Sequence, residues 1–171
     1  MPRLIHASMS TGSFAPLPQE LQPLLLVQRD GKAAQTVDRH GILAAVDASI
    51  SAASVASTAA KIARQCGLPL AIISIASHEA LRAEAEHALA HALAVAEAAG
   101  TRATGRILSG KPFQQILEAA KLPNADLIVI GRHGESDLIR TPFGSTTQKV
   151  LGLSEIPVLV VHPALPESAA I

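Results

Sequence analysis

The chain has 171 residues, which is long enough for one domain of ordinary size with a buried core and too short for two full domains. Lys plus Arg and Asp plus Glu both number 14, so the formal net charge is zero and the composition argues against a nucleic-acid partner. Apolar residues make up 49% of the chain, yet there are three Phe and no Tyr or Trp. We therefore expect an aliphatic core and no aromatic platform for base stacking.

The sequence has no run of about 18 apolar residues, and its start lacks the basic-then-apolar order of a signal peptide. We therefore expect a cytoplasmic protein that makes no contact with a membrane. The single cysteine, Cys66, cannot form an intrachain disulfide. Its position at the end of an Ala-rich helical pattern predicts a small buried residue rather than a nucleophile.

The first 40 residues read as an N-terminal arm. Residues 1–23 mix Pro, Gly, Ser and Thr without apolar periodicity, which predicts an irregular segment. Leu24–Val27 is a short apolar run that predicts a strand, and the polar residues up to 40 read as a linker. We predict a compact domain over residues 41–165 and a disordered tail over residues 166–171.

Strand and helix patterns alternate through the predicted domain. Apolar runs predict strands at 42–46, 70–75, 104–108, 127–130 and 157–161. Helical spacing with start and stop signals predicts helices at 52–65 and 78–99, a third that starts at Pro112 and a fourth that starts at Thr146. This alternation predicts an α/β fold with a single doubly wound, five-stranded, mainly parallel sheet flanked by helices.

The stretch from Asp126 to Thr147 carries the strongest functional signal. A buried strand runs into a glycine turn that also holds His133, and a second glycine with three hydroxyl residues then opens a helix. Glycines let the backbone approach an anion closely, and a helix N-terminus carries partial positive charge. The hydroxyl residues can also cap that helix, and a ligand-free loop uses the same residues. Placed at the carboxyl end of a strand, the pattern predicts a phosphate site formed by Gly131, His133, Gly134, Gly144, Ser145, Thr146 and Thr147.

Three other patterns carry less weight. Gly105 to Lys111 matches the start of a Walker motif, but Pro112 stands where a magnesium-binding Ser or Thr is needed. His87, His91 and Glu84 share a helical face, but a metal site needs further ligands that the sequence does not place nearby. No nucleophile elbow and no dinucleotide-binding glycine motif is present.

The glycine pattern resembles a known signature. Gly131-x-x-Gly134, nine residues, and Gly144-Ser145 is similar to the ATP-binding signature of the universal stress protein family, and the likeness extends from Ile42 to His162. The resemblance implies an adenine nucleotide alpha hydrolase-like fold and ATP, with Mg²⁺ or Mn²⁺ held through its phosphates. It implies that Asp47 contacts the ribose, that the backbone at Ile75 meets adenine, and that the nucleoside and phosphate contacts come from Ile130, Gly131, His133, Gly134, Gly144, Ser145, Thr146 and Thr147.

The resemblance also implies a regulator or sensor in stress responses, without catalysis beyond slow ATP hydrolysis, that acts on an unknown protein partner. Two alternatives stay open: a dimeric interaction module that binds no nucleotide, and a slow ATPase that uses His133 or Asp47. Two departures from the family bear on the nucleoside site. Ala45 replaces a common proline, and only Ala76 and Ser77 separate the second predicted strand from its helix, which would leave adenine less covered.

The last strand and the arm predict an edge contact. Val158–Val161 is an uncharged strand at the predicted sheet edge, so we expect antiparallel pairing, and the resemblance implies a homodimer through this strand. Pro23 to Gln28 repeats the pattern of Pro157 to His162, as if residues 12–28 were the tail of a lost or shortened first domain. The alternative is a coincidence between two short apolar runs. The arm strand could then dock on the last strand of its own or a partner chain.

Overall fold

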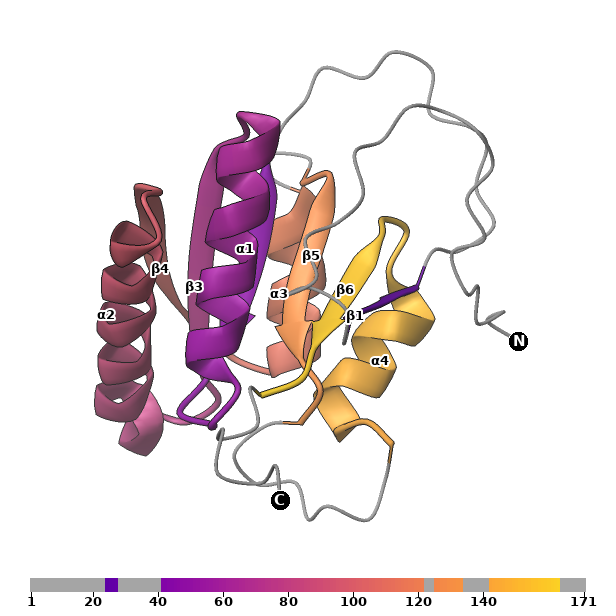
Figure 1. Ribbon diagram of the computed structural model, residues 1–171. Coiled ribbons are helices and arrows are strands. Elements are labelled where there is room, and N and C mark those ends of the chain that lie inside the picture. Colours follow the sequence, from indigo (N-terminus) through magenta and orange to yellow (C-terminus); the bar gives the residue numbers. More distant parts are fainter. Residues whose placement is uncertain (1–23, 28–40, 122–124, 134–141, 164–171) are drawn as a thin grey trace, which may run out of the picture.

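A computed structural model describes residues 24–27, 41–121, 125–133 and 142–163 (Figure 1). Five strands form a parallel sheet in the order β6-β5-β2-β3-β4, which confirms the predicted α/β fold. The elements are β1 (Leu24–Val27), β2 (Ile42–Val46), α1 (Ala52–Cys66), β3 (Leu70–Ala76), the short 3₁₀ helix η2 (Glu79–Leu81), α2 (Arg82–Ala98), β4 (Ala103–Ser109), α3 (Pro112–Lys121), β5 (Leu127–Gly131), α4 (Ser145–Leu153) and β6 (Val158–Val161).

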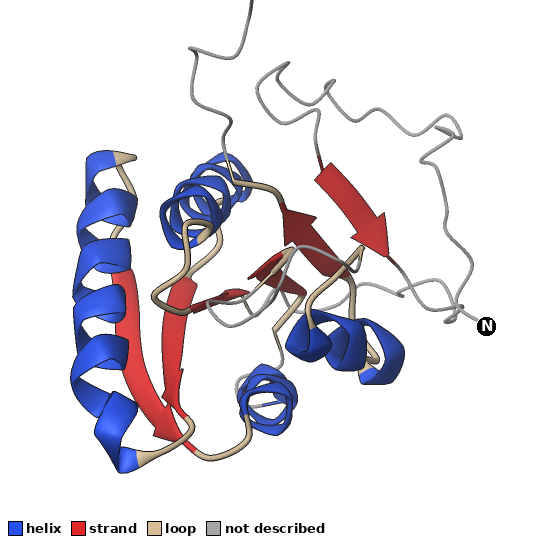
Figure 2. Cartoon of the chain, turned by 90° about the horizontal axis from the view of Figure 1, so that it is seen from below, coloured by secondary structure: helices blue, strands red, loops and turns tan. Residues whose placement is uncertain are grey.

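Helices cover both faces of the sheet (Figures 1 and 2). On one face, α1 and α2 pack on a core that includes Ala44, Ile72 and Val129. On the other face, α3 packs on a core that includes Ile73 and Ile128, and Val150 of α4 belongs to the same cluster. Because β2 and β5 are covered on both faces, their side chains form continuous apolar runs, as expected for parallel strands.

Small residues let the first helical layer lie close to the sheet. Alanines dominate the buried face of both α1 and α2. Gly105 of β4 has no room for a side chain, because a Cβ there would come within 2.8 Å of Leu93 Cδ1 on α2. The many alanines of this chain, with Gly105, therefore allow α1 and α2 to pack closely on the sheet.

Two local predictions were wrong in detail. The helix expected at 78–99 begins as an α-helix only at Arg82, because η2 forms its first turn. His78, before η2, is still in the extended conformation. Cys66 is exposed, not buried. It lies in the last turn of α1, beyond Ala63, which is the last residue of that helix buried in the core.

The strand order creates a switch point between β2 and β5. The chain builds β2, β3 and β4 toward one edge, then crosses back to place β5 and β6 on the other side of β2. The connections that leave the carboxyl ends of β2 and β5 diverge there, which is where ligands bind in open α/β sheets. Asp47 follows β2, and Gly131 ends β5.

The outer edge of β6 is occupied within the chain. Leu24 lies opposite Val161 and Val27 lies opposite Val158, so β1 pairs antiparallel along the whole length of β6. The antiparallel partner of β6 in this chain is therefore β1, and the predicted homodimer stays a prediction. Residues 1–23 and 28–40 of the predicted arm, and the predicted tail at 166–171, lie outside the described residues.

Within the described ranges, no helix is long and apolar enough to cross a membrane.

Candidate functional site

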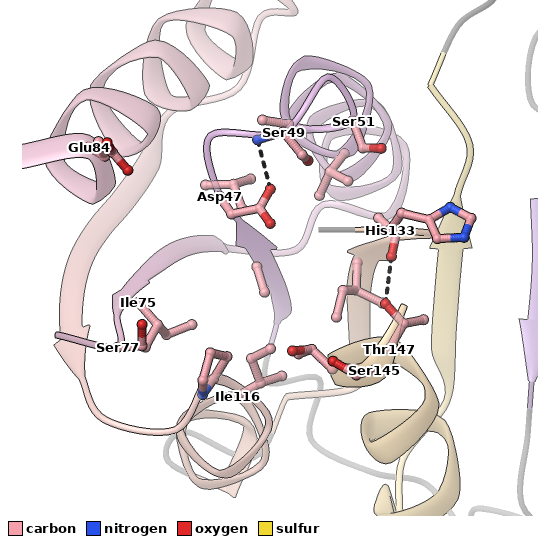
Figure 3. A pocket seen from close by; sticks show the side chains of 18 of the residues that line it. Asp47, Ser49, Ser51, Ile75, Ser77, Glu84, Ile116, His133, Ser145 and Thr147 are labelled. Atoms are coloured by element: carbon pink, nitrogen blue, oxygen red, sulfur yellow. Dashed lines mark hydrogen bonds between the residues drawn. The ribbon is translucent and has the colours of Figure 1, made fainter. Parts of the chain in front are cut away.

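A cavity of about 580 Å³ opens at the switch point, at the carboxyl edge of the sheet (Figure 3). Small-molecule sites occupy roughly 300–1,000 Å³, so its size suits a ligand of nucleotide class. Eight of the ten residues predicted from the sequence line it together: Asp47, Ile75, Ile130, Gly131, His133, Ser145, Thr146 and Thr147. Gly144 is buried directly before this lining at the start of α4, and Gly134 lies outside the described residues.

Asp47 is held at the end of β2. Its Oδ1 accepts a hydrogen bond from the backbone N–H of Ser49 at 3.0 Å, which orients the half-buried carboxylate toward the cavity (Figure 3). The same turn leads into α1, and both its N-cap residue Ser51 and its first residue Ala52 line the cavity. Asp47 therefore presents a fixed acceptor to any hydroxyl or amino group bound there.

The junction between β5 and α4 is closed by two hydrogen bonds. Thr147 Oγ1 donates to the carbonyl oxygen of Gly131 at 2.8 Å, and Gly144 N donates to the carbonyl of Arg132 at 2.9 Å. Thr147 is 2% exposed, so its bond is shielded from water. These contacts hold the N-terminus of α4 beside the end of β5.

The N-terminus of α4 carries no side-chain cap. Gly144 is the N-cap residue and has no side chain, so the predicted hydroxyl cap from Ser145, Thr146 or Thr147 is wrong. The first N–H groups of a helix have no intrahelical acceptor and carry partial positive charge. An anion in the cavity would accept hydrogen bonds from these N–H groups.

The three hydroxyl residues are not equivalent. Thr147 donates its only hydroxyl proton to Gly131, so that proton is not available to a phosphate oxygen. Ser145 is exposed and Thr146 half-buried, and both line the cavity. Phosphate contacts from this segment would therefore come from Ser145, Thr146 and the backbone.

Gly131 is required by close packing at the cavity wall. A Cβ at this position would lie 2.9 Å from the Cβ of Ser51, which is 3% exposed. The start of α1 thus approaches the end of β5 at a distance that only glycine permits. Ser51 is the N-cap residue of α1 but makes no side-chain cap bond, and the backbone carbonyl of Ser49 accepts from Ala52 N at 3.1 Å.

His133 lies at the rim, with its ring turned away from Asp47 (Figure 3). Its charge and that of Arg132 bear on His162, which follows β6. Burial, then Arg132, then His133 lower the pKa of His162 below 6.5. Arg132 Nη1 lies 3.4 Å from His162 Nδ1, and a hydrogen bond from Arg132 requires that nitrogen to be unprotonated. The neutral form of His162 is therefore the one that fits this rim.

The opposite end of the cavity is more apolar. Ile75 at the end of β3 lies near Ser77, and Ile116 of α3 forms the floor (Figure 3). Leu81 of η2 and Glu84 in the first turn of α2 also line the cavity, and the sequence analysis did not place them there. The short connection after β3 leads directly into the segment that carries these two residues.

The charge of the lining is acidic rather than basic. Asp47 and Glu84 contribute carboxylates, whereas no Lys or Arg belongs to the lining among residues that the structure describes. Over those same ranges, no three His, Cys, Asp or Glu side chains group closely enough to hold a metal ion. A bound phosphate would therefore be neutralised by backbone N–H groups, by the α4 N-terminus and by a cation that it brings with it.

The Walker-like stretch is not a loop. Gly105 to Ser109 belong to β4, and the turn follows at Gly110, whose φ is +125°. Pro112 then begins α3 and touches the cavity only as part of its wall.

The sequence matches one family model over most of the described domain. Residues 39–162 match the universal stress protein family. The chain belongs to the universal stress protein family. It is 37% identical over 83 residues to a universal stress protein of Methanocaldococcus jannaschii and 42% identical over 55 residues to the stress response protein NhaX of Bacillus subtilis. These matches cover 48% and 32% of this chain and span 49% and 33% of those two proteins.

Solved structures of this family share the fold. A universal stress protein in complex with cAMP is 28% identical, with a TM-score of 0.63, and the match covers 74% of this chain and 98% of that one. A universal stress protein of Archaeoglobus fulgidus in complex with dAMP is 27% identical, with a TM-score of 0.61, over 71% of this chain and 96% of that one. Some of the structural relatives of this universal stress protein are therefore adenine-nucleotide complexes.

Proposed function

We propose that this universal stress protein binds ATP, with Mg²⁺ or Mn²⁺ held through the phosphates, and acts as a nucleotide-dependent regulator or sensor in the stress response of the cytoplasm. The observation that carries the proposal is the joining of Asp47 and the N-terminus of α4 by one cavity. A nucleotide needs an acceptor for its ribose hydroxyls at one place and a positive dipole for its phosphates at another. The cavity offers both.

The nucleoside would occupy the more apolar half. Ribose hydroxyls would donate to the Asp47 carboxylate, which Ser49 already orients. Adenine would lie beside the backbone at Ile75, and Ile130 with Gly131 would line the wall. Relatives that are complexes with cAMP and dAMP support an adenine nucleotide as the ligand.

The phosphates would occupy the other half. Ser145 and Thr146 would donate hydroxyl and backbone protons, and Gly144 would allow close approach at the N-cap. Gly134 and His133 would complete this set from the turn after β5. Because the described lining has no Lys or Arg, the divalent cation would supply the remaining positive charge.

Regulation rather than catalysis is the role that membership of the universal stress protein family favours. The nucleotide would change the affinity of the protein for a protein partner. Phosphate release from ATP, measured with and without the His133→Ala substitution, tests the slow-ATPase alternative.

Isothermal titration with ATP and Mg²⁺ tests the proposal. The sharpest variant is Ser145→Glu, compared with the isosteric Ser145→Gln. Ser145 is exposed in the first turn of α4, where a carboxylate stabilises the helix by about 0.3–1 kcal/mol. Glu should therefore leave the fold intact and still repel the phosphates.

We expect binding by the wild type and by Ser145→Gln, and at least a tenfold weaker affinity for Ser145→Glu. Nucleotide at 100 times its dissociation constant should also stabilise the wild type by about 2.7 kcal/mol. Absence of heat and of thermal stabilisation at millimolar ATP would sink the proposal and favour an interaction module that binds no nucleotide.

A further inference from the structure

The two edges of the sheet are protected in different ways. At one edge, β4 carries the exposed charged side chain of Arg106, and charge is a known deterrent to edge-to-edge pairing. At the other edge, β6 has the sequence Val-Leu-Val-Val and no charge. β6 is thus the edge that requires a covering strand.

Only the main chain of β6 is left for a partner to recognise. Its four side chains are between 0% and 6% exposed and belong to the cores on the two faces of the sheet. A partner on this edge would therefore bind as an added strand through backbone hydrogen bonds. In the structure β1 does this over all four residues, Leu24 to Val27.

The connection between β1 and β2 permits this pairing within one chain. Val27, Val158, Ile128 and Leu43 lie in one row across four neighbouring strands. Three strand spacings are about 14 Å, whereas the thirteen residues 28–40 can span roughly 40 Å. Linking two segments through a short stretch of chain gives a local concentration on the order of millimolar. The chain's own β1 therefore outcompetes a second copy present at micromolar concentration.

We propose that β1 is a built-in plug: it occupies the edge of β6, keeps that edge from a second copy of the chain, and so holds the protein as a monomer. Removal of β1 from the edge would convert β6 into a dimerisation strand. The predicted homodimer through Val158–Val161 then forms only when the arm is released. This inference does not depend on nucleotide binding.

Disulfide cross-linking tests the intrachain pairing directly. The exposed Cys66 is first replaced by Ser, and two register pairs are made, Leu25→Cys with Val160→Cys and Leu26→Cys with Leu159→Cys. Along an antiparallel ladder the Cα–Cα distance alternates from one directly opposed pair of residues to the next. One of the two register pairs should therefore have the distance that a disulfide needs. The control, Leu25→Cys with Leu159→Cys, is shifted by one residue and puts the thiols on opposite faces.

We expect oxidised glutathione to give an internal disulfide in a monomeric chain for at least one register pair and none for the control. Cross-linked dimers would show that β1 pairs with another copy, and absence of any cross-link would show that it does not pair. Either result overturns the proposal.

Light scattering at 10–100 µM tests the consequence for assembly. The β1 variant carries Leu25→Pro and Leu26→Pro. Of two successive residues in a strand, one has its backbone N–H directed at the partner strand, so the double substitution removes that hydrogen-bond donor to β6 in either case. The control, Leu4→Pro with Ile5→Pro, makes the same change elsewhere in the arm. We expect monomers of about 17.7 kDa for the wild type and the control, and a concentration-dependent dimer for the β1 variant. A dimeric wild type, or a folded β1 variant that stays monomeric, would contradict the proposal.

Discussion

Thr147 and Gly131 are joined by a buried hydrogen bond of 2.8 Å that fastens the first turn of α4 to the last residue of β5. The two residues are 16 positions apart, and eight of the intervening residues, 134–141, lie outside the described ranges. The bond therefore fixes the start of α4 against the end of β5, at the half of the cavity where we propose that phosphates bind.

Loss of the Thr147 hydroxyl should cost stability. Thr147→Val leaves the buried Gly131 carbonyl without this donor, and an unsatisfied buried acceptor costs about 1–3 kcal/mol. Thr147→Ser keeps the donor and removes one methyl group, so it should cost less, about 1 kcal/mol. Urea unfolding of both variants measures the difference. Equal losses for Val and Ser would show that packing, not the hydrogen bond, matters at this position.

The approach of Ser51 to Gly131 should appear as coupling between two substitutions. Gly131→Ala places a Cβ 2.9 Å from Ser51 Cβ, and such overpacking costs about 1–3 kcal/mol. Adding Ser51→Gly removes the obstructing atoms and should recover most of that loss. A double-mutant cycle on the free energy of unfolding measures the coupling. Additive losses would mean that the clash is relieved elsewhere.

Asp47 should matter for binding more than for folding. Asp47→Asn keeps an oxygen that can accept from Ser49 N but removes the charge, so we expect near-wild-type stability and at least tenfold weaker ATP binding. Asp126→Asn is the matched control, because Asp126 Oδ2 also accepts a backbone N–H, from Gly41 at 3.1 Å, at the opposite edge of the sheet. Titration calorimetry on both variants should separate them. Equal affinities would remove Asp47 from the nucleoside site.

The lowered pKa of His162 predicts a loss of stability on the acid side. The unfolded chain takes up a proton near pH 6.5, whereas the folded chain resists protonation because of burial, Arg132 and His133. Stability from this group is therefore complete above about pH 6.5 and is lost as the pH falls toward the folded pKa. His162→Gln should flatten the unfolding free energy over this range, and Arg132→Gln should flatten it in part. An unchanged slope in His162→Gln would assign the acid loss to other groups.

Much of the fold could be read from the sequence, because its signals are local. Apolar runs such as Ile42–Val46 indicate doubly covered strands, and Pro112 marks the start of α3. The buried position expected for Cys66 was wrong, since helical spacing does not show where a helix passes the end of the sheet. Strand order is also not local, and it is what brings Asp47 beside Gly131.

The lining residues that belong to the glycine motif could be predicted from the sequence, and those that other elements bring to the cavity could not. Glycines and hydroxyl residues pointed to the cavity around Gly131 and Ser145. The sequence did not indicate Leu81 and Glu84, because they reach the cavity through the turn from β3 into η2. Nor could it show that the Thr147 hydroxyl donates a hydrogen bond to the Gly131 carbonyl, because that bond joins residues that only the fold brings together.

The most direct test of nucleotide binding at this cavity is a crystal structure of the protein grown with ATP and Mg²⁺. We predict adenine beside Ile75, ribose hydroxyls on the Asp47 carboxylate, and phosphates at Ser145 and Thr146 with the cation bound to them. Density for the nucleotide at another surface, or an empty cavity at saturating ATP, would contradict the account.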